Sequence, residues 1–212
     1  MTRPPSTVEA LLEALGAERE FRDGVLGDLA EEFAARADRD GSATARRWYR
    51  REALRAAPHL LFHWSRRLGV RGGTRLVGVL VVAYGCLVGL GLAFGAIGYA
   101  VLRAVGAPTN YHLPWGNPIA AALMLSAALA VGVVISILNG YLVARLDTEA
   151  PLASAVACGL AWGCIEIIVV MFAHQFPMWY RLAIPIVVST GTAAGGVIAV
   201  LRNRTRARPA IG

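Results

Sequence analysis

Four long apolar stretches, each free or nearly free of charged residues, dominate the chain after residue 75. A helix rises about 1.5 Å per residue, so crossing a bilayer core of about 30 Å takes about 20 residues, and each stretch is long enough. Segments rich in Pro, Gly and polar residues separate the stretches, as expected where helices end. The pattern predicts four membrane-spanning helices, at residues 76–102, 118–144, 151–173 and 182–201.

The first 70 residues have a different pattern, in which apolar positions are spaced as in amphipathic helices. Ser6 and Glu9 have the spacing of a capping box, in which the two side chains accept hydrogen bonds from backbone amides of the first helical turn, and they predict a short helix from Ser6 to Gly16. We therefore expect an all-α polytopic membrane protein with two parts. A cytoplasmic helical module covers residues 1–70, and a four-helix transmembrane bundle covers residues 71–212.

Two longer helices are predicted within the N-terminal part, and each has one apolar side. In the first helix, apolar residues recur at steps of four and lie opposite Glu31, Glu32 and Arg36; they are Phe21, Val25, Leu29, Phe33 and Ala37. The second helix follows Gly41, and its apolar side holds Trp48, Tyr49, Ala53, Ala57 and Leu60. This patterning predicts a compact helical unit.

Charge is divided sharply within the N-terminal part. Residues 1–40 hold five Arg and ten acidic residues, whereas residues 41–75 hold nine Arg and one Glu. The basic half adjoins the first span, and each Arg near an anionic leaflet contributes about 1 kcal/mol of attraction. We expect this helix to lie on anionic lipid headgroups, through Arg46, Arg47, Trp48, Tyr49, Arg50, Arg51, Arg66 and Arg67. Nucleic acid is disfavoured as a partner, because these arginines adjoin the membrane and no nucleic-acid-binding motif accompanies them.

The distribution of arginine predicts the orientation of the spans. Arg is concentrated before the first span and after the fourth, Arg145 lies between the second and third, and the other two loops hold only Arg103 and Arg181. Cytoplasmic flanks carry the excess of positive charge, so we expect both termini in the cytoplasm. Four aromatic residues are expected at the headgroup level of the far side: Tyr111, Trp115, Trp179 and Tyr180.

The composition supports a membrane protein and excludes several classes of enzyme. Hydrophobic residues make up 56% of the 212 residues and the mean hydropathy is +0.53, above the usual range of soluble domains. All 21 basic residues are Arg, and the absence of Lys excludes a P-loop, a pyridoxal Schiff base and a lysine nucleophile. No metalloprotease, serine-hydrolase or dinucleotide-binding motif occurs. We expect a non-enzymatic protein without a cofactor, and free thiols at Cys86, Cys158 and Cys164.

Glu166 is the single acidic residue within a predicted span. Ionisable residues at such depth generally face the protein interior and have a partner. The candidate partners are Arg103, Arg181, Tyr99, Ser189 and Thr190. A structural hydrogen bond or ion pair is the favoured interpretation, and a proton relay or substrate contact is the alternative. Asn139 is the other notable polar residue within a span.

Glycines four residues apart recur in three spans. Because they lack a side chain, they let helix backbones approach closely in lipid. Packing within one four-helix bundle is favoured, and contact with another subunit, above all through the glycine-rich first span, is the alternative. The glycines are Gly85, Gly89, Gly91, Gly95, Gly159, Gly163, Gly191 and Gly195.

The histidines give a weaker indication of ligand binding. His59 and His63 have the i, i+4 spacing of a metal-binding helical face, but no third ligand joins them, so interfacial packing is favoured. His112 and His174 lie in the two far-side loops and are weak candidates for binding a metal or a pigment.

One part of the N-terminal region resembles a known family. The string Phe21-Arg-Asp-Gly-Val-Leu-Gly-Asp-Leu-Ala-Glu-Glu-Phe33, followed by Gly41 and Ala45-Arg-Arg-Trp-Tyr-Arg-Arg-Glu52, resembles the permease prefix domain of bacterial efflux permeases of the MacB/FtsX kind. The resemblance covers roughly residues 6–62 and implies a bacterial inner-membrane protein whose N-terminal module docks on a membrane or a partner. Those permeases have a large extracytoplasmic domain after the first span, whereas residues 103–117 of this chain are too few for one, so the permease activity does not carry over.

These observations predict an accessory, scaffolding or regulatory subunit that packs against a larger membrane complex, either a transporter or an energy-converting assembly. Its expected partners are anionic lipid headgroups and other membrane subunits. Two alternatives stay open: a small transporter or channel component that uses Glu166, and a metal- or pigment-binding membrane protein.

Overall fold

The computed structural model describes residues 4–15, 19–104, 118–172 and 176–207. The regular structure in these ranges is entirely α-helical, which confirms the predicted fold class. The helices are α1 (Ser6–Glu13), α2 (Arg19–Asp40), α3 (Ser42–Arg67), α4 (Val70–Ala104), α5 (Pro118–Leu146), α6 (Pro151–Phe172) and α7 (Met178–Ala207).

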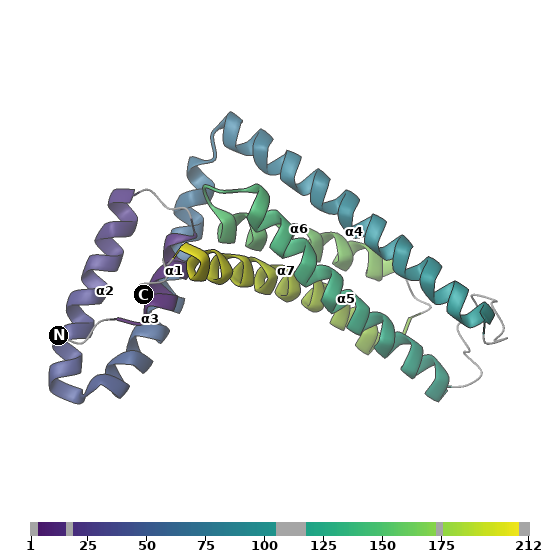
Figure 1. Cartoon of the computed structure of the whole chain (residues 1–212), viewed down its shortest axis with the longest axis horizontal. Coiled ribbons are helices and arrows are strands. Elements are labelled where there is room, and N and C mark those ends of the chain that lie inside the picture. Colours follow the sequence, from purple (N-terminus) through teal and green to yellow (C-terminus); the bar gives the residue numbers. More distant parts are fainter. Residues whose placement is uncertain (1–3, 16–18, 105–117, 173–175, 208–212) are drawn as a thin grey trace.

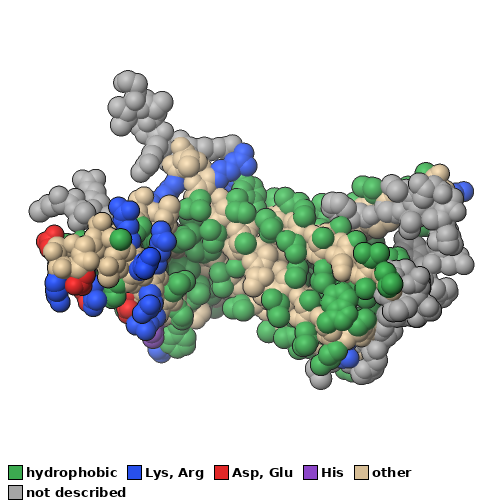
Figure 2. All heavy atoms as spheres, turned by 90° about the horizontal axis from the view of Figure 1, so that it is seen from below, with side chains coloured by type: hydrophobic (Ala, Val, Ile, Leu, Met, Phe, Trp, Pro, Cys, Tyr) green, Lys and Arg blue, Asp and Glu red, His purple; other side chains and the backbone are tan. Residues whose placement is uncertain are grey.

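Helices α4 to α7 are long and apolar enough to cross a membrane. Their apolar segments each overlap one predicted span and run over Gly72–Ile97, Ala121–Leu146, Pro151–Val170 and Met178–Thr205. Hydrophobic side chains cover the middle of the molecule, whereas most charged side chains gather at the end that holds the N-terminal helices (Figure 2). The chain is therefore a multi-pass membrane protein.

The four long helices are not packed equally tightly. Helix α7 packs along both α5 and α6, whereas α4 lies on the outside and packs mainly against α5 (Figure 1). Only 11% of the apolar segment of α4 is buried inside the protein, compared with 44% for α6. The interior of the membrane part is thus built mainly by α5, α6 and α7.

The predicted apolar faces of α2 and α3 pack against each other. Phe33 of α2 and Tyr49 of α3 are fully buried, and their rings meet edge to face with centroids 5.7 Å apart. Gly41 joins the two helices with φ of 84°, a left-handed conformation that glycine adopts without steric cost. The amphipathic patterns of both helices are confirmed.

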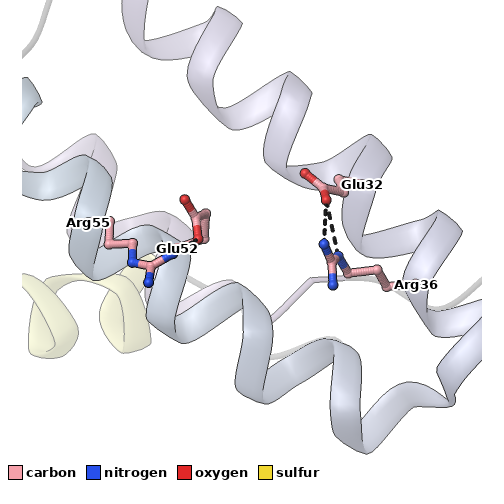
Figure 3. Close-up of polar contacts among 4 residues, drawn as sticks. All are labelled: Glu32, Arg36, Glu52 and Arg55. Carbon is pink, nitrogen blue, oxygen red and sulfur yellow. Dashed lines mark hydrogen bonds and ion pairs between the residues drawn. The ribbon is translucent and has the colours of Figure 1, made fainter.

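The charged residues on the outer sides of α2 and α3 pair within each helix. Arg36 bonds Glu32 one turn earlier at 2.8 Å, and Arg55 bonds Glu52 at 3.2 Å (Figure 3). Exposed pairs of this spacing contribute about 0.3–0.5 kcal/mol each. The association of α2 with α3 therefore depends on the buried apolar faces.

Helix α1 begins without the predicted capping box. Pro5 occupies the N-cap position, Ser6 is already helical, and no side chain caps the helix. The carbonyl of Pro5 instead accepts hydrogen bonds from the amides of Val8 and Glu9, at 3.0 and 3.4 Å. The capping-box prediction was wrong because Ser6 lies one residue too far into the helix for its hydroxyl to reach the orphan amides.

The N-terminal helices are joined to the membrane bundle through α1. The Leu152 amide donates to the Ala14 carbonyl at 3.1 Å, and Leu12 and Leu15 belong to the same buried apolar cluster as Leu152 and Val200. The cluster extends from this junction into the packing of α2 on α3. The two parts predicted from the sequence therefore share one continuous core.

Candidate functional site

Glu166 lies on the face of α6 that packs against α7. The same face carries Gly159 and Gly163, which touch α7, because positions 159, 163 and 166 follow helical spacing. A Cβ on Gly159 would stand 2.8 Å from the carbonyl oxygen of Ser189, so the two backbones approach closely here. The glycine face thus leads directly to the half-buried Glu166.

A cavity of about 220 Å³ opens beside Glu166, where α4, α5, α6 and α7 meet. Most of its wall is apolar. Its three polar side chains come from different helices: Ser136 from α5, Glu166 from α6 and Tyr180 from α7. The remaining lining residues are Leu87, Gly91, Ala128, Leu129, Gly132, Ile135, Ile184, Val187 and Val188.

The partners expected for Glu166 lie elsewhere. Arg181 donates from Nε to the carbonyl oxygen of Val170 at 2.8 Å, at the end of α6. Arg103 is exposed near the end of α4. In the described part of the chain, no ion pair or hydrogen bond joins the Glu166 carboxylate to either arginine.

No hydrogen bond joins the other three candidates to Glu166 in the described ranges either. Tyr99 is exposed on α4, and the Thr190 hydroxyl donates to the Ile186 carbonyl at 2.6 Å within α7. Ser189 packs against Gly163 on the neighbouring turn of α6. Within the described residues, none of the five candidates is therefore seen bonded to Glu166.

Tyr180 is the residue that sequence reasoning missed. It was expected at the headgroup level, but it lines the cavity and interacts electrostatically with Glu166. A signal was present, because positions 180, 184, 187 and 188 follow the spacing of one helical face. Arg181 is the next residue after Tyr180, and the helical step of about 100° between consecutive residues turns the arginine away from this face.

Asn139 lies one turn from Ser136 on the same face of α5 and is fully buried. Neither its amide nitrogen nor its amide oxygen has a hydrogen-bond partner in the described part of the chain. The side chain of Asn139 does not line the cavity beside Glu166. The two intramembrane polar residues singled out in the sequence therefore have separate environments.

The glycines divide into two groups. Those on α6 and α7 fill close helix contacts: Gly191 faces Ser136, Gly195 faces the backbone of α5, and Gly159 and Gly163 face α7. In contrast, no described atom lies within 4 Å of the place where a Cβ would stand on Gly85, Gly89, Gly91 or Gly95 of α4. Packing within the bundle therefore explains the glycines of α6 and α7, but these four glycines of α4 have no close neighbour among the described residues.

The basic face of α3 is exposed, but its aromatic residues are not arranged as predicted. Tyr49 is fully buried against α2, and Trp48 is half-buried beneath the guanidinium of Arg36, 4.5 Å from the ring centroid. The prediction that both rings enter the headgroups was wrong, because the packing of α2 covers them. The exposed arginines are Arg46, Arg47, Arg50, Arg51 and Arg66, and the side chain of Arg67 lies outside the described residues.

Tyr49 carries the clearest perturbed titration outside the membrane spans. Burial raises its pKa to about 12, and the charges of Glu9 and Glu13 act in the same direction. Its hydroxyl has no hydrogen-bond partner in the described part of the chain. Burial and the missing partner both indicate a structural residue.

The two histidines among the described residues, His59 and His63, do not form a ligand cluster. His63 stacks on Phe21 with ring centroids 4.4 Å apart, and His59 is exposed. His112 and His174 lie outside the described residues, as do Tyr111 and Trp115. Within the described ranges, no group of three His, Cys, Asp or Glu side chains has the arrangement of a metal site.

Comparisons of the chain with protein-family models, curated proteins and solved structures found no match.

Proposed function

We propose that this protein is a non-enzymatic accessory or scaffolding subunit of a bacterial inner-membrane complex, and that α4 packs against a helix of another subunit. The observation that carries the proposal is the uncovered glycine face of α4. Close-packed glycines occur on α5, α6 and α7, but no described atom lies within 4 Å of the place where a Cβ would stand on Gly78, Gly85 or Gly89 of α4. A helix that carries small residues without a neighbour can admit a second backbone at close range.

The face in question follows helical spacing along the outer side of α4. It carries Gly78, Val82, Gly85, Gly89 and Leu92, all of them exposed. The side chains of Val82 and Leu92 are 52% and 70% exposed, and they border the shallow groove that the glycines leave on the helix surface. Glycine grooves bordered by branched side chains suit the close crossing of two membrane helices.

The cytoplasmic placement of the N-terminal helices rests on charge. The exposed arginines of α3, Arg75 at the start of α4 and Arg204 near the end of α7 belong to the same end of the molecule, because α1 packs against α7 and Arg75 pairs with the α5–α6 turn. The positive-inside rule assigns this end to the cytoplasm. The resemblance of residues 6–62 to the permease prefix domain supports a bacterial inner membrane, and the exposed α3 arginines support binding to anionic headgroups.

Site-specific photo-crosslinking in native membranes tests the proposal. A photoreactive residue at Leu92 is expected to give a discrete crosslinked product with another protein. The matched position is Ile168 on α6, which is 59% exposed on a different span. Products of equal yield from both positions, or none from Leu92, would contradict the assignment of the face.

A second test uses added bulk. Gly89→Leu places a side chain where no described atom lies within 4 Å of the added Cβ, so the protein itself is expected to fold normally and to lose its partner during purification. Ala130→Leu adds similar bulk at an exposed position of α5 and serves as the control. Retention of the partner by both variants would count against the proposed face.

Transport is a second candidate function, and one observation favours it: Glu166 lines a cavity formed by all four spans. The test is solute flux in proteoliposomes containing the wild type or the Glu166→Gln variant. Flux that is present in the wild type and lost in a folded variant would support transport. Flux that is unchanged by the substitution would assign Glu166 a structural role.

A further inference from the structure

The cavity beside Glu166 joins one acidic group to an apolar wall. Its polar atoms are the Glu166 carboxylate and the hydroxyls of Ser136 and Tyr180, and the other lining side chains are aliphatic or absent. In the described part of the chain, no cation or hydrogen-bond donor is paired with the carboxylate. A carboxylate at this depth gains stability from a cation brought into contact with it.

The number and type of oxygen ligands in the cavity limit which cations it can bind. Calcium takes six to eight oxygen ligands and magnesium requires octahedral geometry, whereas this cavity offers one carboxylate and two hydroxyls. An ammonium group needs far fewer partners: it donates three hydrogen bonds, and three side chains with acceptor oxygens line the cavity. The ring of Tyr180 adds a favourable surface for a cation.

The apolar wall and the volume of the cavity limit the chemistry and size of the part of the ligand beyond its ammonium group. Leu87, Ile184 and Val188 offer no hydrogen bond and favour a hydrocarbon tail. The volume of about 220 Å³ lies below the range of about 300–1,000 Å³ typical of pockets for drug-sized ligands. A compact ligand therefore fits better than a drug-sized one.

We propose that this cavity binds a small protonated monoamine, with its ammonium group on Glu166, Ser136 and Tyr180 and its hydrocarbon tail between α4, α5 and α7. The site deepens the second candidate function by naming a ligand class. It does not depend on α4 docking, and equilibrium binding without flux would keep the site while dismissing transport.

The experiment measures the binding of phenethylamine to the full chain in nanodiscs of phosphatidylcholine, by saturation-transfer NMR and calorimetry. The neutral probe is 2-phenylethanol, which has the same ring and tail without the ammonium group. Saturable binding of the amine, at least tenfold tighter than that of the alcohol, is expected. Equal affinity for the two probes would overturn the proposal, because the carboxylate would then contribute nothing.

Two variants assign the binding to Glu166. Glu166→Gln is expected to weaken amine binding at least tenfold, whereas Glu31→Gln removes an exposed carboxylate on α2 and is expected to leave it unchanged. Amine affinity within twofold of the wild type in Glu166→Gln would overturn the assignment. Size-exclusion profiles establish whether each variant is folded.

A third variant keeps the test decisive if Glu166→Gln does not fold. Gly132 lines the cavity, and no described atom lies within 4 Å of the position that a Cβ on it would occupy. Gly132→Leu therefore fills the cavity while Glu166 stays in place, and it is expected to abolish amine binding. Unchanged binding in this variant would place the amine elsewhere.

Discussion

Arg75 at the start of α4 forms ion pairs with Asp147 and Glu149 in the turn between α5 and α6, at 3.1 and 2.7 Å. Asp147 is largely buried, and it also accepts hydrogen bonds from the backbone amides of Glu149 and Ala150 and from the Ser154 hydroxyl. One carboxylate therefore organises the α5–α6 turn and holds one end of α4. The long apolar part of α4 beyond this anchor is buried far less than the other spans.

The anchor predicts a ranking of three substitutions. Asp147→Ala removes the ion pair and leaves buried amides unsatisfied, so it is expected to lower the free energy of unfolding by about 2–3 kcal/mol. Arg75→Ala is expected to cost about 1 kcal/mol, because the arginine is partly solvated. Glu149→Gln serves as the control: its side chain is 82% exposed, and it is expected to change little. Unfolding by denaturant in detergent micelles measures all three, and a cost for Glu149→Gln as large as that for Asp147→Ala would contradict the anchor.

The glycines provide a second prediction, because their surroundings differ so sharply. A Cβ on Gly140 would fall on the backbone of Thr192, and one on Gly195 would fall on the backbone of Ile137. Alanine at either site is expected to cost at least about 1–3 kcal/mol, the usual range for overpacking. Gly85→Ala on α4 meets open space and is expected to be neutral, or stabilising by up to about 1 kcal/mol through helix propensity.

Thermal unfolding of the purified chain checks this contrast. The isolated chain is the right sample, because a partner on α4 would mask the tolerance of Gly85. Equal destabilisation by Gly85→Ala and Gly140→Ala would show that the face of α4 around Gly85 is packed within its own chain.

The sequence predicted the spans well but not the neighbours of their side chains. Long runs with at most one charged residue set the span positions to within a few residues, because polar residues or prolines flank each run. Tyr49 was predicted at the membrane surface and is buried, since an amphipathic face shows where apolar groups lie and not whether lipid or α2 covers them. Tyr180 was missed for the same reason. The helical spacing of α7 places Tyr180 on the cavity side, but the opposite charge of its neighbour Arg181 favoured the arginine as the predicted partner of Glu166.

Tyr49 yields a third prediction, which concerns alkaline pH. Its folded pKa is raised to about 12 from the ordinary 10, so the folded protein holds the proton while the unfolded chain releases it. The free energy of unfolding falls with rising pH wherever the unfolded state binds fewer protons than the folded state. Stability is therefore expected to fall as pH rises above about 10. The loss near pH 12 is expected to reach about 2 kcal/mol.

Tyr49→Phe isolates this effect. The hydroxyl is buried without a partner, so its removal is expected to stabilise the protein by about 1 kcal/mol at neutral pH. The advantage of the variant is then expected to widen between pH 10 and pH 12, because the phenylalanine has no proton to lose. Circular dichroism of both proteins across this range gives the difference directly, and a constant difference would show that Tyr49 ionises as freely when folded as when unfolded.

The junction between α1 and the membrane bundle yields the last prediction. Besides the backbone hydrogen bond from Leu152 to Ala14, two kinds of side-chain contact can be compared there: the apolar packing of Leu12 and Leu15 near Leu152, and the ion pair of Arg204 with Glu13 at 3.1 Å. The charged side chains are 39% and 47% exposed, so Glu13→Gln is expected to cost at most about 0.5 kcal/mol. Leu12→Ala opens a cavity in the shared core and is expected to cost about 2–4 kcal/mol.

Limited proteolysis separates local detachment of α1 from global unfolding. If apolar packing holds the junction, Leu12→Ala exposes α1 to cleavage while the membrane bundle stays intact, and Glu13→Gln behaves as the wild type. The reverse order of sensitivity would mean that the ion pair carries the junction. In that case high salt should release α1 from the wild type as well, because screening weakens exposed ion pairs but not apolar contacts.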